Sequence, residues 1–81
     1  MYKSTDEILE ILDPIIDWLT IDRIYTGRWK VVITDNKTLS KWVGNGKTLP
    51  EALFDAVVFM NTYSEIVEFD INDLYKKDEN I

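Results

Sequence analysis

Residues 28–43 read RWKVVITDNKTLSKWV, and they contain the strongest structural signal in the chain. Trp29, Val31 and Ile33 alternate with neighbours on the other face, and a period of two predicts a strand with one buried face. Residues 35–37 then supply turn-forming side chains before a second mixed run leads back. The stretch therefore predicts an antiparallel β-hairpin with Trp29 on its buried face.

A helix is predicted before the hairpin. Ser4 is followed three residues later by Glu7, which is the pattern of a capping box, and an amphipathic pattern continues to about Leu19. Pro14 lacks a backbone donor, and its ring clashes with the preceding turn of a helix. We therefore expect one helix that ends near Leu19, with a kink or break at Asp13.

A second helix is predicted after the hairpin. Residues 44–46 contain two glycines, and we expect them to end the sheet. Thr48 is a suitable cap, Pro50 fits the first turn, where its missing donor is harmless, and apolar residues continue to Met60. The helix is apolar on nearly all sides, so more than one surface must cover it.

Together these signals predict a single α+β domain over residues 1–81. A small antiparallel sheet of two or three strands packs with an N-terminal and a C-terminal helix, in the order α-β-β-(β)-α. The additional strand is expected at residues 21–25. We expect an ordered core over residues 4–75, with a short strand or a helical turn in residues 66–75, and a flexible tail at residues 76–81.

Cysteine and histidine are both absent. Their absence excludes disulfides, thiolate or imidazole zinc sites, and Ser-His or Cys-His catalytic dyads. We identify no catalytic residue, no metal site and no cofactor site, and we expect a protein that is not an enzyme. The N-terminus has no signal-peptide pattern and no apolar run is long enough to span a bilayer, so a cytoplasmic location without membrane contact is expected.

The net charge of −6 is unevenly distributed along the chain. Residues 1–22 contain one lysine and six acids, residues 23–47 contain six basic residues and one acid, and residues 48–81 contain two lysines and eight acids. The candidate partner-binding residues are acids that lie off the apolar stripe of the first helix, namely Glu7, Glu10 and Asp17. Because opposite charges steer association, we expect a partner protein with a basic surface.

The basic central segment provides an alternative binding face, made of Arg28, Lys30, Lys41 and Trp42. Basic and aromatic side chains together are typical of surfaces that neutralise phosphates and stack bases. An alternative function is therefore a nucleic-acid or nucleotide binder that uses the hairpin of residues 23–47. The overall negative charge opposes attraction of nucleic acid, so nucleic acid is not the expected partner.

The order of these signals resembles the small bacteriophage ABA sandwich domains. The likeness covers residues 4–60: a helix capped at Ser4, a strand centred on Trp29, a hairpin return, and the run from Gly46 to Ala56 that leads into the last helix. The resemblance implies a phage or prophage origin and a fold in which a short antiparallel sheet packs with an N-terminal and a C-terminal helix. It implies no activity and no binding residues.

Two other families share parts of this pattern. Residues 28–56 are similar to HicB-type antitoxins, in which a hairpin precedes the motif Gly-x-Thr-x-x-Glu-Ala, here residues 46–52. Those proteins neutralise a small RNA-cleaving toxin by binding it. The helix–sheet–helix order with residues 44–48 also resembles the double-stranded-RNA-binding domain. That family contacts phosphates through lysines at positions that here hold Leu49, Pro50 and Leu53.

The expected function is that of a small acidic protein-binding module, a phage-encoded modulator or inhibitor of a host enzyme that acts by occlusion or by nucleic-acid mimicry. The alternatives are a HicB-like antitoxin that neutralises a toxin and the nucleic-acid binder described above. The expected partner is a host or phage protein. A homodimer is also expected, because Phe54, Val58 and Phe59 lie off the main apolar stripe of the second helix.

Overall fold

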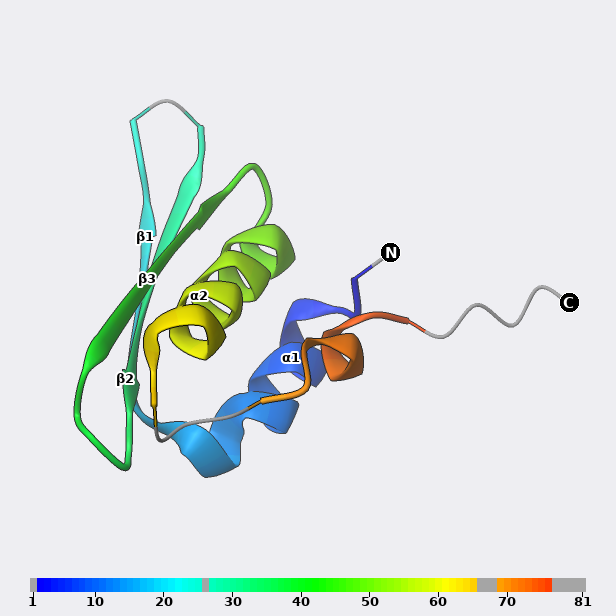
Figure 1. Ribbon diagram of the computed structural model, residues 1–81. Helices are drawn as coiled ribbons and strands as arrows, with labels where there is room; N and C mark the ends of the chain where they lie inside the picture. Colours follow the sequence, from blue (N-terminus) through cyan, green and yellow to red (C-terminus); the bar gives the residue numbers. More distant parts are fainter. Residues whose placement is uncertain (1, 26, 66–68, 77–81) are drawn as a thin grey trace, which may run out of the picture.

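The structure, a computed structural model, describes residues 2–25, 27–65 and 69–76. Its elements are α1 (Thr5–Leu12), the 3₁₀ turn η1 (Asp13–Ile15), β1 (Ile16–Arg23), β2 (Trp29–Asp35), β3 (Lys41–Gly46), α2 (Leu49–Tyr63) and the 3₁₀ turn η2 (Ile71–Leu74). Both helices lie on the same side of an antiparallel sheet of three strands (Figure 1). The α+β class and the expected order of elements are confirmed, with the additional strand present.

The first helix is shorter than its apolar pattern predicts. The Ser4 hydroxyl accepts the amide of Glu7 at 3.3 Å, and the Glu7 carboxylate accepts the amide of Ser4 at 3.2 Å, which completes the expected capping box. The break expected at Asp13 is confirmed, because η1 begins there, but the expectation of a helix as far as Leu19 is wrong. Pro14 interrupts the helical hydrogen bonds, and the β-branched residues after it favour extended backbone.

β1 begins at Ile16, earlier than the strand expected at residues 21–25. It pairs with β2, and β2 pairs with β3, so β2 is the central strand. In the β1–β2 turn, the amide of Gly27 donates to the carbonyl of Ile24 at 3.0 Å, and the amide of Ile24 donates to the carbonyl of Arg28 at 2.8 Å. Gly27 has a φ of 80°, which glycine adopts without steric strain.

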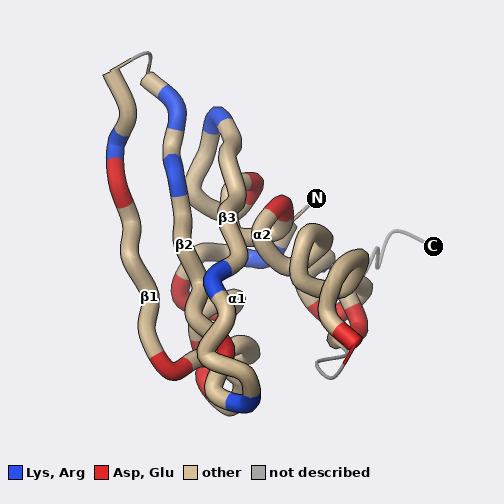
Figure 2. Tube along the Cα trace, turned by 60° about the vertical axis from the view of Figure 1, so that its left-hand side comes forward, with Lys and Arg blue, Asp and Glu red and all other residues tan. Residues whose placement is uncertain are grey.

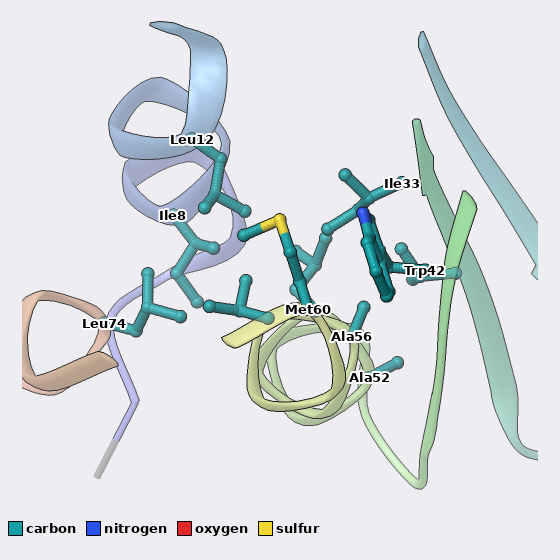
Figure 3. Packing of buried hydrophobic residues seen from close by; sticks show 11 residues of the cluster. Ile8, Leu12, Ile33, Trp42, Ala52, Ala56, Met60 and Leu74 are labelled. Atoms are coloured by element: carbon teal, nitrogen blue, oxygen red, sulfur yellow. The ribbon is translucent and has the colours of Figure 1, made fainter. Parts of the chain in front are cut away.

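The core lies between the sheet and α1, with α2 in the middle. Figure 3 shows Met60 of α2 with Ile8 and Leu12 of α1 on one side and Ile33 and Trp42 of the sheet on the other. Burial of one such large apolar side chain contributes about 1.5–3 kcal/mol. The hydrophobic residues with no exposed surface are Ile8, Leu12, Val31, Ile33, Ala52, Leu53, Ala56, Val57, Met60 and Leu74.

The glycines at residues 44–46 are part of β3. This strand is the last of the sheet, as expected, but Gly44 and Gly46 lie opposite β2 residues and directly beneath α2 instead of forming a turn. A Cβ added at Gly46 would lie 2.7 Å from the backbone nitrogen of Ala52. The two glycines therefore allow α2 to approach β3 more closely than any side chain would permit.

The described part of the tail, residues 69–76, packs against α2. The side-chain amide of Asn61 donates to the carbonyl of Phe69, and the Asn61 side-chain oxygen accepts the Phe69 amide at 3.1 Å. η2 confirms the helical turn expected in this segment. Residues 66–68, which include most of the alternative strand, lie outside the described residues.

Part of the apolar surface that suggested a homodimer is covered within the chain. The ring of Phe54 packs against the rings of Tyr2 and Tyr75, at centroid distances of 5.0 and 5.1 Å, and those two rings stack on each other at 5.4 Å. Phe59 remains 43% exposed, with Tyr63 5.1 Å away along α2. The homodimer stays a prediction, but Phe54 no longer supports it.

Candidate functional site

The sheet has one covered face and one uncovered face. α2 packs on β2 and β3, and Val31, Ile33 and Trp42 are buried beneath it. Figure 1 shows both helices on this side, and none of the described elements lies against the opposite face. We call that opposite surface the outer face. By strand alternation its residues are Trp18, Thr20 and Asp22 of β1, Lys30, Val32 and Thr34 of β2, and Lys41, Val43 and Asn45 of β3.

The strand register arranges the outer face in three cross-strand rows. The rows are Trp18, Thr34 and Lys41; Thr20, Val32 and Val43; and Asp22, Lys30 and Asn45. The middle row is mainly apolar, with both valines half-buried, and each flanking row contributes one lysine. The Trp18 side chain is 68% exposed. A large exposed aromatic side chain beside a pair of valines is an apolar patch of the kind that marks interaction surfaces.

Three of the four residues of the predicted basic face come together here. Lys30 and Lys41 are exposed on the outer face, and Arg28, two residues before Lys30, lies on the same side by strand alternation. Figure 2 shows basic residues along β2 and near the ends of β3, whereas acidic residues mark the helices and also β1, which contains two aspartates and one arginine. α1 and α2 contain aspartate and glutamate but no lysine or arginine. The charge segments of the sequence therefore become an acidic helical layer on one side of the sheet, whereas the basic side chains of the sheet are concentrated at β2 and β3.

Trp42, the fourth residue of the predicted basic face, is not part of it. Its side chain is only 9% exposed, and its indole N–H donates to the carboxylate of Asp35 at 2.8 Å. The ring of Phe59 lies 5.7 Å away on α2. The prediction of an exposed Trp42 is wrong because the β2–β3 register places it opposite Ile33, on the covered face.

Asp35 is a fully buried carboxylate at the end of β2. Besides Trp42, its donors are the amides of Lys37 and Thr38, at 3.0 and 2.6 Å, and the Thr38 hydroxyl, at 2.7 Å. Burial raises the pKa of Asp35, but these hydrogen bonds outweigh burial and lower the pKa from 3.8 to about 2. All its donors come from its own hairpin, so the role of Asp35 is to fix the β2–β3 turn.

The buried carboxylate makes stability depend on pH. Since folding lowers the pKa of Asp35, its stabilising effect is complete above about pH 4 and is lost as the pH falls from about 4 to 2. We expect a loss on the order of 1–2 kcal/mol over that range. Urea unfolding of the parent and of Asp35→Asn at several pH values measures it. The variant should be less stable at neutral pH, and the difference should shrink at pH 2; a difference that stays constant would contradict the prediction.

The predicted acidic site does not form one face of one helix. Glu7 and Glu10 lie on α1, whereas Asp17 lies in β1, where a bulge between Ile16 and Trp18 leaves it without a partner in β2. The hydrogen bond from the Ser4 side chain lowers the pKa of Glu7, which is therefore already engaged in the helix cap. Reversal of its charge would disturb the fold as well as any contact.

The described residues show no other arrangement with evident chemistry. Among them, no group of three or more acidic side chains is placed to hold a metal ion. No helix in the same part of the chain is long and apolar enough to cross a membrane. The outer face is therefore the candidate functional site, and it is a binding surface.

The chain matches no protein-family model, no curated protein and no solved structure. The resemblances suggested by short motifs therefore remain predictions.

Sequence reasoning missed the contribution of β1 to the outer face. Trp18 falls in the predicted helix and Thr20 lies just after it, so only Asp22 falls in the strand predicted at residues 21–25. A signal was present: Leu19 and Ile21 alternate with these three residues, as in a strand.

Proposed function

We propose that this protein is a small binding module that recognises another protein through the outer face and acts by occluding the partner's surface. The outer face itself carries the proposal. Antiparallel sheets often expose one face, but such faces are usually polar. Here Trp18, Val32 and Val43 form an apolar patch between two lysines.

The chemistry of the face defines the partner. We expect an apolar segment flanked by aspartate or glutamate, because Lys30 and Lys41 lie on either side of the valine row and outnumber Asp22, the acid that shares this face. Opposite charges increase the association rate and select the orientation of a partner, while the apolar centre supplies most of the affinity. This partner is opposite in charge to the one that the acids of α1 suggested.

A phage-encoded modulator of a host enzyme is the finer form of this proposal, and a HicB-like antitoxin is another. Both act by covering a protein surface, so the same outer face would serve either. Only the resemblances in short sequence motifs support these identities.

Nucleic acid is the second candidate ligand. One observation favours it: the exposed Trp18 shares a face with Lys30 and Lys41, so a base could stack while phosphates are neutralised. Asp22 in the same face and the net charge of −6 oppose it.

A position-specific cross-linking experiment tests the proposal. A photo-reactive amino acid at Val43, on the outer face, is expected to give a covalent protein adduct in bacterial cells, whereas the same group at Glu10 on α1 is not. The double variant Lys30→Glu/Lys41→Glu should reduce the adduct about tenfold, because it reverses the charges that steer association. The matched control Lys37→Glu/Lys47→Glu changes two exposed loop lysines and should leave the yield unchanged.

Two outcomes would decide against the proposal. Equal yields from Val43 and Glu10, or equal yields from the two double variants, would show that the outer face is not the binding surface. An adduct that nuclease removes and protease leaves would favour nucleic acid. The affinity of the protein for nucleic acid should then fall steeply as the salt concentration rises, because phosphate contacts release counterions.

A further inference from the structure

The two edges of the sheet differ in how their backbone groups are satisfied. At the β3 edge, the amide of Asn45 donates to the Asp55 carboxylate at 2.9 Å, and α2 packs along the strand. β1 forms the other edge, on the side of the sheet away from α2 (Figure 2). Exposed edge strands are sites of pairing with another chain unless charges, bulges or covering segments block them.

The backbone of β1 alternates between β2 and the free edge. The amide of Ile24 donates to the carbonyl of Arg28 at 2.8 Å, so the residues two, four and six positions earlier also turn their backbone groups toward β2. The odd-numbered residues, Leu19, Ile21 and Arg23, then direct their N–H and C=O groups outward. No described residue bonds to the outward groups of Leu19 and Ile21.

The side chains of β1 are also incompletely covered. α2 packs mainly on β3 and β2, so Leu19 is only half-buried and Ile21 is 37% exposed, although both lie on the covered face of the sheet. The strand has eight residues, more than the usual length of about five or six, and its bulge is confined to the end near Asp17. It combines unpaired backbone groups with apolar side chains beside them.

We propose that the β1 edge pairs with β1 of a second copy in antiparallel orientation, to give a continuous sheet of six strands. A two-fold axis perpendicular to the sheet places the outer faces of both copies on the same side. Because the odd-numbered residues of β1 direct their backbone groups outward, each of them must pair with an odd-numbered residue of the second copy. The proposal is independent of the proposed function, because pairing uses the edge and not the centre of the outer face.

One register is self-complementary. With the axis at Thr20, Leu19 lies opposite Ile21 of the second copy, and Asp17 lies opposite Arg23 of the second copy, each pair occurring twice. On the outer face Trp18 meets Asp22, an indole donor opposite a carboxylate acceptor. If the axis moves by one residue along β1 in either direction, Asp17 and Arg23 no longer lie opposite each other. Arg23 then lies opposite Leu19 of the second copy, or Asp17 lies opposite Ile21 of the second copy. Opposite charges placed directly across strands stabilise a pair, and like charges destabilise it.

The consequence is a wider binding surface. Thr20 of both copies would meet at the axis, with Trp18 of each copy opposite Asp22 of the other, so the two outer faces would join into one. The paired edge is small compared with a standard protein interface, and we expect a dissociation constant in the micromolar range.

Sedimentation velocity over about 1–200 µM, a range that brackets a micromolar constant, tests the pairing. The parent, of 9.5 kDa, should shift toward twice that mass as the concentration rises. Asp17→Arg and Arg23→Asp should each weaken association at least tenfold, because each places like charges opposite one another twice. The double variant Asp17→Arg/Arg23→Asp restores opposite charges and should return the constant to within about threefold of the parent.

A second pair of variants separates pairing from general apolar contact. Ile21→Lys should give a monomer, because lysine in an edge strand opposes pairing. The control Leu39→Lys changes a side chain that is 62% exposed in the β2–β3 turn, and should leave association unchanged. Circular dichroism confirms that each variant is folded. A parent that stays monomeric throughout, a dimer that Ile21→Lys does not affect, or a double variant that remains as weak as the single ones would overturn the proposal.

Discussion

Replacement of Gly44 by alanine is expected to lower the free energy of unfolding by about 3 kcal/mol or more, a large part of the total for a small domain. An added Cβ would lie 2.8 Å from the Cα of Ala56 and closer still to the carbonyl oxygen of Ala52. Both are backbone atoms of α2, so no side-chain rotation relieves the clash. The whole helix would have to move away from β3, which would open the core around Met60.

Urea unfolding followed by far-ultraviolet circular dichroism measures this effect. Gly27→Ala is the matched control, because nothing lies within 4 Å of an added Cβ there and only the φ of 80° opposes the change. That control should cost about 1–2 kcal/mol. If Gly44→Ala proved no more destabilising than Gly27→Ala, the close approach of α2 to β3 would not be required for the fold.

The same contact shows where sequence reasoning reaches its limit. Gly44 and Gly46 are two residues apart, and Ala52 and Ala56 are four apart, so each pair shares one face of its own element. Each spacing is visible in the sequence. The contact between the glycine face of β3 and the alanine face of α2 is part of the tertiary structure and cannot be read from either spacing. Without knowledge of that contact, a pair of glycines before a helix cap is typical of a turn.

Local signals predicted most of the fold correctly. The capping box at Ser4, the cap at Thr48 and the alternation in β2 are short-range patterns, and the structure contains all three elements. The boundary between α1 and β1 was wrong, because the apolar residues from Ile8 to Leu19 happen to follow a helical period. Pro14 decided the outcome, since a helix could not continue through it.

The candidate site was only partly predictable, because its residues depend on strand register. Alternation within β2 correctly placed Lys30 on the face opposite Val31 and Ile33. Which side chains of β3 face the core could not be predicted in the same way, because the pairing of β3 with β2 depends on the length of the turn between them. A shift by one residue exchanges the faces of every side chain in a strand. Lys41 was therefore assigned to the correct face, and Trp42 was wrongly assigned to the same one.

The same ambiguity affects the two tryptophans of the hairpin. Trp29 does point toward the covered side, as expected, but it lies at the end of the sheet and is only half-buried, with the Arg23 guanidinium 4.8 Å from its ring centroid. Trp42 is central. It contacts Phe59 through its ring and Asp35 through its indole N–H, and thereby links α2, β3 and the turn that holds β2 to β3.

Trp42→Ala is therefore expected to destabilise the protein by about 3–5 kcal/mol, because it leaves a cavity beneath α2 and removes one donor from the buried Asp35 carboxylate. Trp29→Ala removes a similar side chain from the rim, where solvent can fill the space, and should cost about 1–2 kcal/mol. Urea unfolding followed by far-ultraviolet circular dichroism compares the two without relying on tryptophan fluorescence. A third variant, Trp42→Phe, keeps most of the ring volume but not the donor, so it should fall between the other two. If Trp29→Ala proved more destabilising than Trp42→Ala, Trp29 and not Trp42 would be the central tryptophan of the core.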